Sequence, residues 1–194
     1  MTASVWNVVA SHNAFDHRWY VVRRDTLQLP DGTIVDDYFV SVRPDVVVIV
    51  AIDRSGQMII VRQYKHGIRE ITLEFPAGTF KGEPPEAAAL RELEEETGYV
   101  PGRIEYLGRC FDDASKNTNT VHMFLALDCE LRGQQKLERM EKAAGLEVLL
   151  LPVDKIARAL DSGEIAAMSS VAAGYHALRK LSTSGFVAGA PHST

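Results

Sequence analysis

Three glutamates, Glu92, Glu95 and Glu96, lie in one short stretch of the sequence that has the composition of a helix. Helix residues advance by about 100° each, so these positions project from one side, one turn apart. Like charges at such spacings destabilise an isolated helix by roughly 0.2–0.5 kcal/mol per pair. One interpretation is a solvated acidic face, with Arg91 offsetting Glu95 four residues later. We adopt the other, a site for Mg²⁺ or Mn²⁺, because these cations prefer oxygen ligands.

The element that must position these carboxylates is predicted to be a helix from Glu86 to Thr97. Pro84 and Pro85 suit its first turn, where a missing N–H costs nothing and φ is already fixed. No breaker follows, and Gly98 stands where a left-handed residue should end the helix. The apolar stripe beside the acidic side, which we expect to pack on a sheet, consists of Ala89, Leu90 and Leu93.

A strand and a turn lead into this helix. Residues 71–75 are predicted to form the strand, and Pro76, Ala77 and Gly78 form the turn. The acidic side of the helix would then face backbone carbonyls across a cleft. Zinc is not expected, because the stretch has no paired Cys/His set.

The stretch GEPPEAAALRELEEETGY resembles the Nudix box, usually written G-x5-E-x7-R-E-U-x-E-E-x-G-U, where U is apolar. Glu83, Arg91 and the three glutamates of the helix occupy their places in that pattern, as do Leu93, Gly98 and Tyr99. One departure is clear: four residues separate Gly78 from Glu83, so the loop before the helix is one residue short.

The resemblance implies an α/β fold, an α/β/α sandwich with a mixed sheet, over residues 44–181. It also implies that Glu92 and Glu96 are the main metal ligands, that Glu95 assists in catalysis and ligation, and that the Ala77 carbonyl adds a backbone oxygen. Glu83 and Arg91 would pair to fix the loop, and Gly98 would serve as a structural residue of the box.

Outside the box, the chain is similar to the ADP-ribose pyrophosphatase branch of this family in its LPDG, VRQY, EFPAG and LPVDKIARALDSGEI segments. Lys65 stands where those enzymes usually place an arginine, and the loop at residues 112–120 lacks a proline often associated with ADP-ribose specificity. A lysine can hold a phosphate, although without the bidentate fork of arginine. We expect substrate contacts from Lys65, Gly78 and Ser115.

The general base is implied to be a glutamate in the flexible segment before the last strand. That segment, KLERMEKAAG, offers Glu138 and Glu141. Each could instead belong to the solvated face of a short helical turn. We favour Glu141 because it lies closer to the strand that anchors the segment.

Residues 1–43 are predicted to form an antiparallel β arm, with strands at 19–22 and 38–42 and a turn at Leu29-Pro30-Asp31-Gly32. A ribbon of two or three strands is marginal alone, so the arm must pack on something, either its own domain or a partner subunit. The branch resemblance implies a homodimer built with this arm, and we adopt it. Residues 182–194 are rich in Ser, Gly, Ala and Pro and are predicted to be a flexible tail.

Further strands are predicted at 46–52, 58–64, 104–111, 121–129 and 146–153. The apolar strand at 46–52 should be buried on both faces. Asp154 is predicted to cap a helix that runs through Leu160, and a longer helix should span 165–181. Cys110 and Cys129 lie in apolar runs and are expected to pack in the core.

The composition sets limits on partners and location. The chain has 194 residues, 46% of them hydrophobic, and a net charge of −5, which argues against a general nucleic-acid or membrane-surface binder. The N-terminus lacks a signal pattern, and the apolar run at 46–52 is far below the roughly 18 residues that span a bilayer. We expect a soluble cytoplasmic protein.

The function expected from this resemblance is Mg²⁺-dependent hydrolysis of the pyrophosphate bond in a nucleoside diphosphate sugar, ADP-ribose or a related ADP-sugar first, giving AMP and a sugar phosphate. Mn²⁺ would substitute for Mg²⁺. The alternatives are a Nudix hydrolase for another nucleotide sugar or an oxidised nucleotide, and an inactive module that binds nucleotide sugars. An inactive module should have lost box carboxylates, whereas this chain keeps them all.

Overall fold

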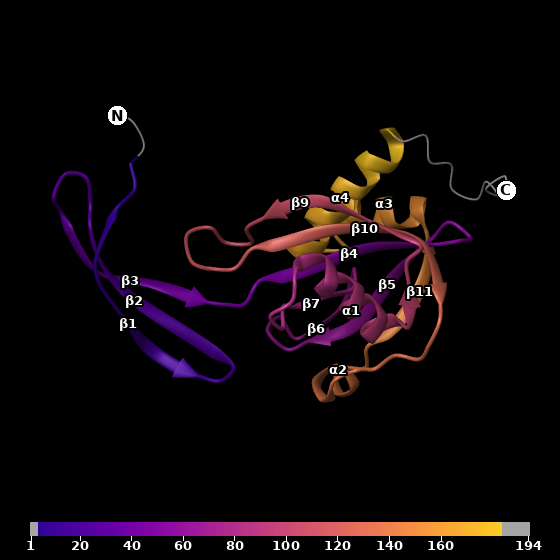
Figure 1. Cartoon of the computed structure of the whole chain (residues 1–194), viewed down its shortest axis with the longest axis horizontal. Coiled ribbons are helices and arrows are strands. Elements are labelled where there is room, and N and C mark those ends of the chain that lie inside the picture. The colour runs from indigo at the N-terminus through magenta and orange to yellow at the C-terminus, as the bar shows by residue number, and fades with distance from the viewer. Residues whose placement is uncertain (1–3, 184–194) are drawn as a thin grey trace. The chain divides into compact units, whose positions relative to one another are not determined.

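The computed structural model describes residues 4–183 (Figure 1). These form two compact units: residues up to 44 together with 111–120, and residues 45–110 together with those from 121 onward. Of the predicted tail, only Ser182 and Thr183 are described, at the end of a helix; residues 184–194 lie outside the described residues.

The first unit contains the predicted antiparallel arm, built from β1 (Asn7–His17), β2 (Tyr20–Gln28) and β3 (Ile34–Val42) in that order. The predicted turn joins β2 to β3, where Gly32 N–H donates to the Leu29 carbonyl at 2.9 Å. Asp25 lies in the central strand, opposite Ser11 of β1 and Tyr38 of β3.

The loop at residues 111–120 folds with this arm. The Tyr38 hydroxyl donates to the Ser115 carbonyl at 2.6 Å, and Ser41 exchanges backbone hydrogen bonds with Lys116 and Thr118 at 2.7 and 3.1 Å. Arg43 adds an ion pair with Asp112 at 3.3 Å. The arm is therefore held by a loop that comes from the middle of the chain.

The second unit contains, within the described residues, a mixed sheet of eight strands. Its main path runs β11 (Glu147–Pro152), β5 (Gln57–Lys65), β4 (Val46–Asp53), β10 (Val121–Leu131) and β8 (Tyr99–Val100). Three strands pair beside this path: β6 (Glu70–Glu74) with β5, β7 (Ala77–Thr79) with β4, and β9 (Arg103–Cys110) with β10. The β4–β10 pair is parallel and the others are antiparallel.

Helices cover both faces of this sheet, which confirms the predicted α/β/α sandwich (Figure 1). Strand β4 is buried on both sides, as predicted, because its side chains alternate between two apolar clusters. One cluster packs against α1 (Pro85–Thr97), and the other against α3 (Val153–Ser162) and α4 (Met168–Thr183). Cys129 belongs to the first cluster and Cys110 packs against the second, as expected. A short helix, α2 (Arg139–Ala143), lies in the connection from β10 to β11.

Helix α1 ends at Thr97 as predicted and begins at Pro85, one residue before the predicted start. Pro84 precedes the helix in extended conformation, and Gly98 ends it with φ of 76° while donating its N–H to the Glu94 carbonyl at 2.8 Å. The apolar stripe differs from the prediction, because Ala88, Ala89 and Leu93 are buried whereas Leu90 is 37% exposed. Leu90 lies about 100° around the helix from Ala89 and so points away from the sheet.

Other predicted ends were wrong. Asp154 lies in the first turn of α3, where its carboxylate pairs with Arg158 at 2.7 Å, and the residue preceding the helix is Pro152. Helix α4 begins at Met168 rather than at Ile165, because Ile165 is fully buried in a turn in which its N–H donates to the Ala159 carbonyl at 3.0 Å. Ala77 and Gly78, expected in a turn, belong to β7.

Within residues 4–183, no helix combines the length and apolar character needed to cross a membrane.

Candidate functional site

Helix α1 approaches the sheet closely where β7 pairs with β4. A Cβ atom on Gly78 would lie 2.0 Å from Cδ of Glu92, so the Glu92 carboxylate occupies the space that a side chain at position 78 would fill. Only glycine permits this approach. The structure therefore places Gly78, predicted to contact substrate, directly against a predicted metal ligand.

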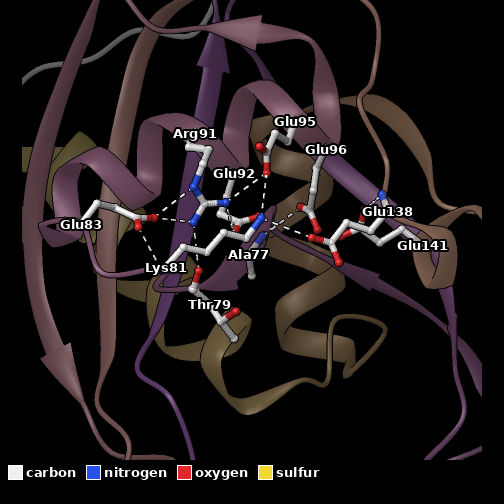
Figure 2. A network of polar contacts seen from close by, with 10 residues as sticks. All are labelled: Ala77, Thr79, Lys81, Glu83, Arg91, Glu92, Glu95, Glu96, Glu138 and Glu141. Carbon is white, nitrogen blue, oxygen red and sulfur yellow. Dashed lines mark hydrogen bonds and ion pairs between the residues drawn. The ribbon is translucent and has the colours of Figure 1, made fainter. Parts of the chain in front are cut away.

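Arg91 is the centre of the polar network on α1 (Figure 2). Its guanidinium donates to Glu83 at 3.0 and 2.5 Å, to Glu92 at 2.6 Å and to Glu95 at 3.0 Å. It also donates to the Thr79 carbonyl at 3.0 Å. Glu83 and Arg91 thus meet as the resemblance implied, although the loop between Gly78 and Glu83 is one residue short.

Glu96 carries a buried carboxyl group that has no ion-pair partner among the described residues. It is 3% exposed and accepts one hydrogen bond, from the Ala77 N–H at 3.0 Å. Burial raises the pKa of Glu96 to about 8, and the negative charges of Glu141 and Glu92 act in the same direction. Among residues 4–183, no Lys, Arg or His side chain forms an ion pair with it. A buried carboxylate without a cationic partner is a suitable ligand for a metal ion.

Glu92 is also buried, and burial raises the pKa of its carboxyl even though Arg91 donates to it. The described residues contain no group of three or more His, Cys, Asp or Glu side chains already arranged to hold a metal ion. Two of the predicted metal ligands, Glu92 and Glu95, form ion pairs with Arg91. The donor chemistry nonetheless fits a hard divalent cation, because two buried carboxylates lie one turn apart on α1.

The segment that carries α2 brings Glu138 and Glu141 to the same network. Figure 2 shows both residues at the end of the network opposite Glu83, where Lys81 donates to Glu138 and the charge of Glu141 acts on Glu96. The two glutamates cap α2 reciprocally: the Glu138 side chain accepts from the Glu141 N–H, and the Glu138 N–H donates to Glu141 Oε2 at 2.6 Å. Both candidate bases therefore reach the site, and the electrostatic effect of Glu141 extends to Glu96.

Lys65 lies near the site at the end of β5. Its ammonium pairs with Glu74 at 3.0 Å, and its charge opposes the rise in the pKa of Glu96 that burial causes. Lys65 and Glu141 also line a pocket of about 370 Å³, together with Gln63, Tyr64, His66, Met140, Ala143 and Ala144. The two charged residues of this pocket, Lys65 and Glu141, both have charges that act on Glu96.

Ser115 belongs to the first unit, whereas the residues described above belong to the second. Its N–H and hydroxyl both donate to Asp113 at 3.1 Å, within a turn of the loop. The sequence interpretation missed two participants, the Thr79 carbonyl and Lys81. Lys81 was detectable only as a cation in the short loop before the box helix.

Comparisons with known families match nearly the whole described chain. Residues 42–169 match the NUDIX domain, and residues 6–41 match the nucleoside diphosphate sugar hydrolase N-terminal domain. The boundary between the two matches falls at the end of β3.

Two relatives and one solved structure extend this likeness. The chain is 28% identical to the ADP-ribose pyrophosphatase of Bacillus subtilis over 158 aligned residues. The alignment covers 81% of this chain and 84% of that protein. It is 32% identical over 178 residues to the ADP-ribose pyrophosphatase of Mycobacterium tuberculosis, covering 90% of this chain and 83% of that protein. The crystal structure of an ADP compounds hydrolase has a TM-score of 0.84 at 21% identity, over 96% of this chain and 100% of that chain. At that identity, the last comparison concerns the fold alone.

Proposed function

Because the chain belongs to the NUDIX domain family and is a hydrolase that acts on pyrophosphate bonds, we propose that its substrate is a nucleoside diphosphate sugar, with ADP-ribose first. The products would be AMP and ribose 5-phosphate. The observation that carries the proposal is the pair of buried carboxylates, Glu92 and Glu96, held on α1 beside Glu141 and Lys65.

The proposed cofactor is Mg²⁺, which Mn²⁺ can replace. Glu92 and Glu96 would hold it, with Glu95 and the Ala77 carbonyl as further oxygen ligands. When bound, such an ion offsets phosphoryl charge and makes water a stronger nucleophile near neutral pH. Glu96 supports this assignment because its carboxylate is buried and without an ion-pair partner among the described residues. Hard oxygen donors suit Mg²⁺ and Mn²⁺ better than softer metals.

The residues of this chain would have distinct tasks in the hydrolysis. Glu141 accepts the proton of the attacking water, since it is the candidate base whose charge acts on Glu96. Lys65 offsets charge on the phosphates. Arg91 holds Glu83, Glu92 and Glu95 in place rather than contacting substrate.

The bond changes follow from these tasks. The water oxygen forms a bond to one phosphorus of the pyrophosphate, and the bond from that phosphorus to the bridging oxygen breaks. The bridging oxygen leaves with the other phosphate. The proton taken up by Glu141 is released to solvent before the next turnover.

The proposed assembly is a homodimer through the arm. The arm exposes large apolar side chains, with Val8 and Val9 each 56% exposed, Phe15 53% and Trp19 72%. Every residue of β1 is exposed. A three-stranded sheet with large apolar side chains exposed is marginal alone, and such surfaces mark interaction sites.

The proposal is tested by offering a panel of substrates with Mg²⁺ and identifying the products by chromatography. The panel would contain ADP-ribose, ADP-glucose, a GDP-hexose, a UDP-hexose and an oxidised nucleoside triphosphate. The expected result is that kcat/KM is highest for ADP-ribose and that AMP is released. Higher kcat/KM for a non-adenine nucleotide sugar or the oxidised nucleotide would replace ADP-ribose with that substrate. No turnover of any of them would contradict the proposed function.

A further inference from the structure

We propose that Lys81 and Glu138 form an ion-pair clamp that positions the Glu141 carboxylate beside the carboxylates of α1. This inference rests on the function proposed above, in which Glu141 is the base. Lys81 and Glu138 are then positioning residues, because they act on the reaction through Glu141.

The clamp joins two segments that are far apart in the sequence. Lys81 lies in the short loop before α1, and its ammonium is 3.2 Å from Glu138 Oε1 and 3.7 Å from Glu95 Oε2. Figure 2 shows the Lys81 side chain extended from this loop toward both carboxylates. The pKa of Lys81 is raised, chiefly by the hydrogen bond to Glu138. The ammonium therefore ties the segment before β11 to the helix that carries the metal-ligand candidates.

The clamp reaches Glu141 through the reciprocal cap of α2. The Glu138 side chain, which Lys81 holds, also accepts from the backbone N–H of Glu141. In return, the Glu138 N–H fixes Glu141 Oε2 at 2.6 Å. One carboxylate oxygen of Glu141 is thereby held in place, and the charge of this carboxylate acts on Glu96. Fixing Glu138 therefore fixes both the backbone and the carboxylate of Glu141.

The loop itself is fixed at the base of Lys81. The Lys81 N–H donates to Glu83 Oε2 at 2.9 Å, and Glu83 is held in turn by Arg91. Lys81 thus extends from an anchored backbone, so its ammonium has fewer positions available than one on a free loop. An anchored cation loses less entropy when it forms an ion pair.

A second ion pair provides a matched control. Lys136, two residues before Glu138, pairs with Glu94 of α1 at 2.6 Å, and both side chains are well exposed. This pair also joins the segment to α1. Within residues 4–183, however, the side chains of this pair form no described hydrogen bond or ion pair with Glu138 or Glu141. If any ion pair between the segment and α1 could position Glu141, removing the Lys136–Glu94 pair should lower kcat as much as removing the Lys81–Glu138 pair.

The kinetic test is a double-mutant cycle on Lys81→Met and Glu138→Gln. Glutamine keeps an oxygen acceptor for the Glu141 N–H and removes only the charge, so the cap survives. Each single variant should lose about two- to fivefold in kcat at unchanged KM, the range expected for breaking one exposed ion pair. The double variant should lose no more than Lys81→Met alone, because the ion pair that Glu138→Gln breaks is already absent in Lys81→Met. Lys81→Arg should retain wild-type kcat, and so should Lys136→Met.

Amide hydrogen exchange in the segment at residues 134–146 provides a readout that needs no substrate. Exchange should be about two- to fivefold faster in Lys81→Met and in Glu138→Gln than in wild type, and unchanged in Lys81→Arg. If the wild type hydrolyses none of the substrates, the function fails, and this measurement alone decides whether the clamp holds the segment.

Several results would overturn the clamp. Losses in kcat that multiply in the double variant would mean that the two residues act separately. A rise in KM for Lys81→Met would place Lys81 on the substrate instead. Unchanged exchange would show that the segment does not depend on the pair, and faster exchange with wild-type kcat would show that the pair does not position the base.

Discussion

Gly78 and Glu92 share one space: a Cβ atom at position 78 would lie 2.0 Å from Cδ of Glu92 and 2.2 Å from its Oε2. The atoms in conflict are at the end of the glutamate side chain rather than in the backbone. The fold can therefore accommodate a side chain at position 78 by moving the Glu92 carboxylate. A site that needs this carboxylate in its present position would lose its function.

We predict that Gly78→Ala lowers kcat about 100-fold or more while the protein stays folded. A displacement of about 1 Å in a positioned group can have an effect of this size. Activity assays and thermal melts of both proteins check it. Gly133→Ala is the control, because a Cβ there meets nothing within 4 Å. Wild-type activity in Gly78→Ala would show that the carboxylate has no required position.

Glu141 and Glu138 should respond differently to the loss of their charge. Glu141→Gln should lower kcat by about 10²- to 10⁴-fold with KM nearly unchanged, as expected for removal of a general base. Glu138→Gln should have only the small effect of a broken ion pair. Steady-state kinetics of the two variants distinguish the roles. The reverse order would assign the base to Glu138, and wild-type rates in both would place it elsewhere.

Asp25 should make the stability of the arm depend on pH. The pKa of its carboxyl is lowered, first by the hydrogen bonds from Arg23 and then by the one from Ser11, against the opposing effect of burial. A lowered folded-state pKa gives a stabilisation that is fully present above the ordinary aspartate pKa of about 4 and is lost as the pH falls through the folded value.

Asp25→Asn should therefore lower the free energy of unfolding by about 1–3 kcal/mol at pH 7, the usual range for losing hydrogen bonds to a charged group. The difference from wild type should shrink below about pH 4. Urea unfolding at pH 7, 5 and 3.5 measures it. Asp36→Asn in the same arm should change stability by less than about 0.5 kcal/mol, because Asp36 is 72% exposed. An equal effect of Asp25→Asn at every pH would refute the electrostatic explanation.

The apolar arm should produce a homodimer. Light scattering of the active protein at tens of micromolar should give twice the chain mass of 21.4 kDa. Replacing Val9 and Trp19 by serine should shift the mass toward the monomer, since both side chains are exposed apolar surface. A monomer mass for the active wild-type protein would be inconsistent with assembly through the arm.

Local sequence signals were sufficient for the central elements. Pro84, Pro85 and Gly98 marked both ends of α1, because proline geometry and a left-handed glycine depend on the backbone alone. The continuous apolar run of β4 predicted burial on both faces, which the two clusters confirm. The start of α4 was misjudged because Ile165 continues the apolar pattern of the helix although it lies in a buried turn before it.

Contacts between distant segments were not visible in the sequence. The contact of Gly78 with Glu92 and the ion pair of Lys81 with Glu138 depend on how β7, α1 and the segment of α2 pack. The grouping of residues 111–120 with the arm likewise depends on hydrogen bonds such as that from Tyr38 to the Ser115 carbonyl. Hydrophobic periodicity and secondary-structure propensity describe neighbouring residues in the sequence, so they do not predict such long-range contacts.

The rate of AMP release from ADP-ribose tests whether the α1 carboxylates hold a divalent metal for pyrophosphate hydrolysis. The rate would be measured for wild type with Mg²⁺, for metal-stripped wild type in EDTA, and for Glu96→Gln with Mg²⁺. Burial raises the pKa of Glu96 to about 8, so the neutral glutamine should leave the metal-free fold intact at pH 7. We predict a loss of about 10³-fold or more in kcat for Glu96→Gln and no turnover in EDTA. Full turnover in EDTA, or a wild-type rate in the folded variant, would show that these carboxylates hold no catalytic metal.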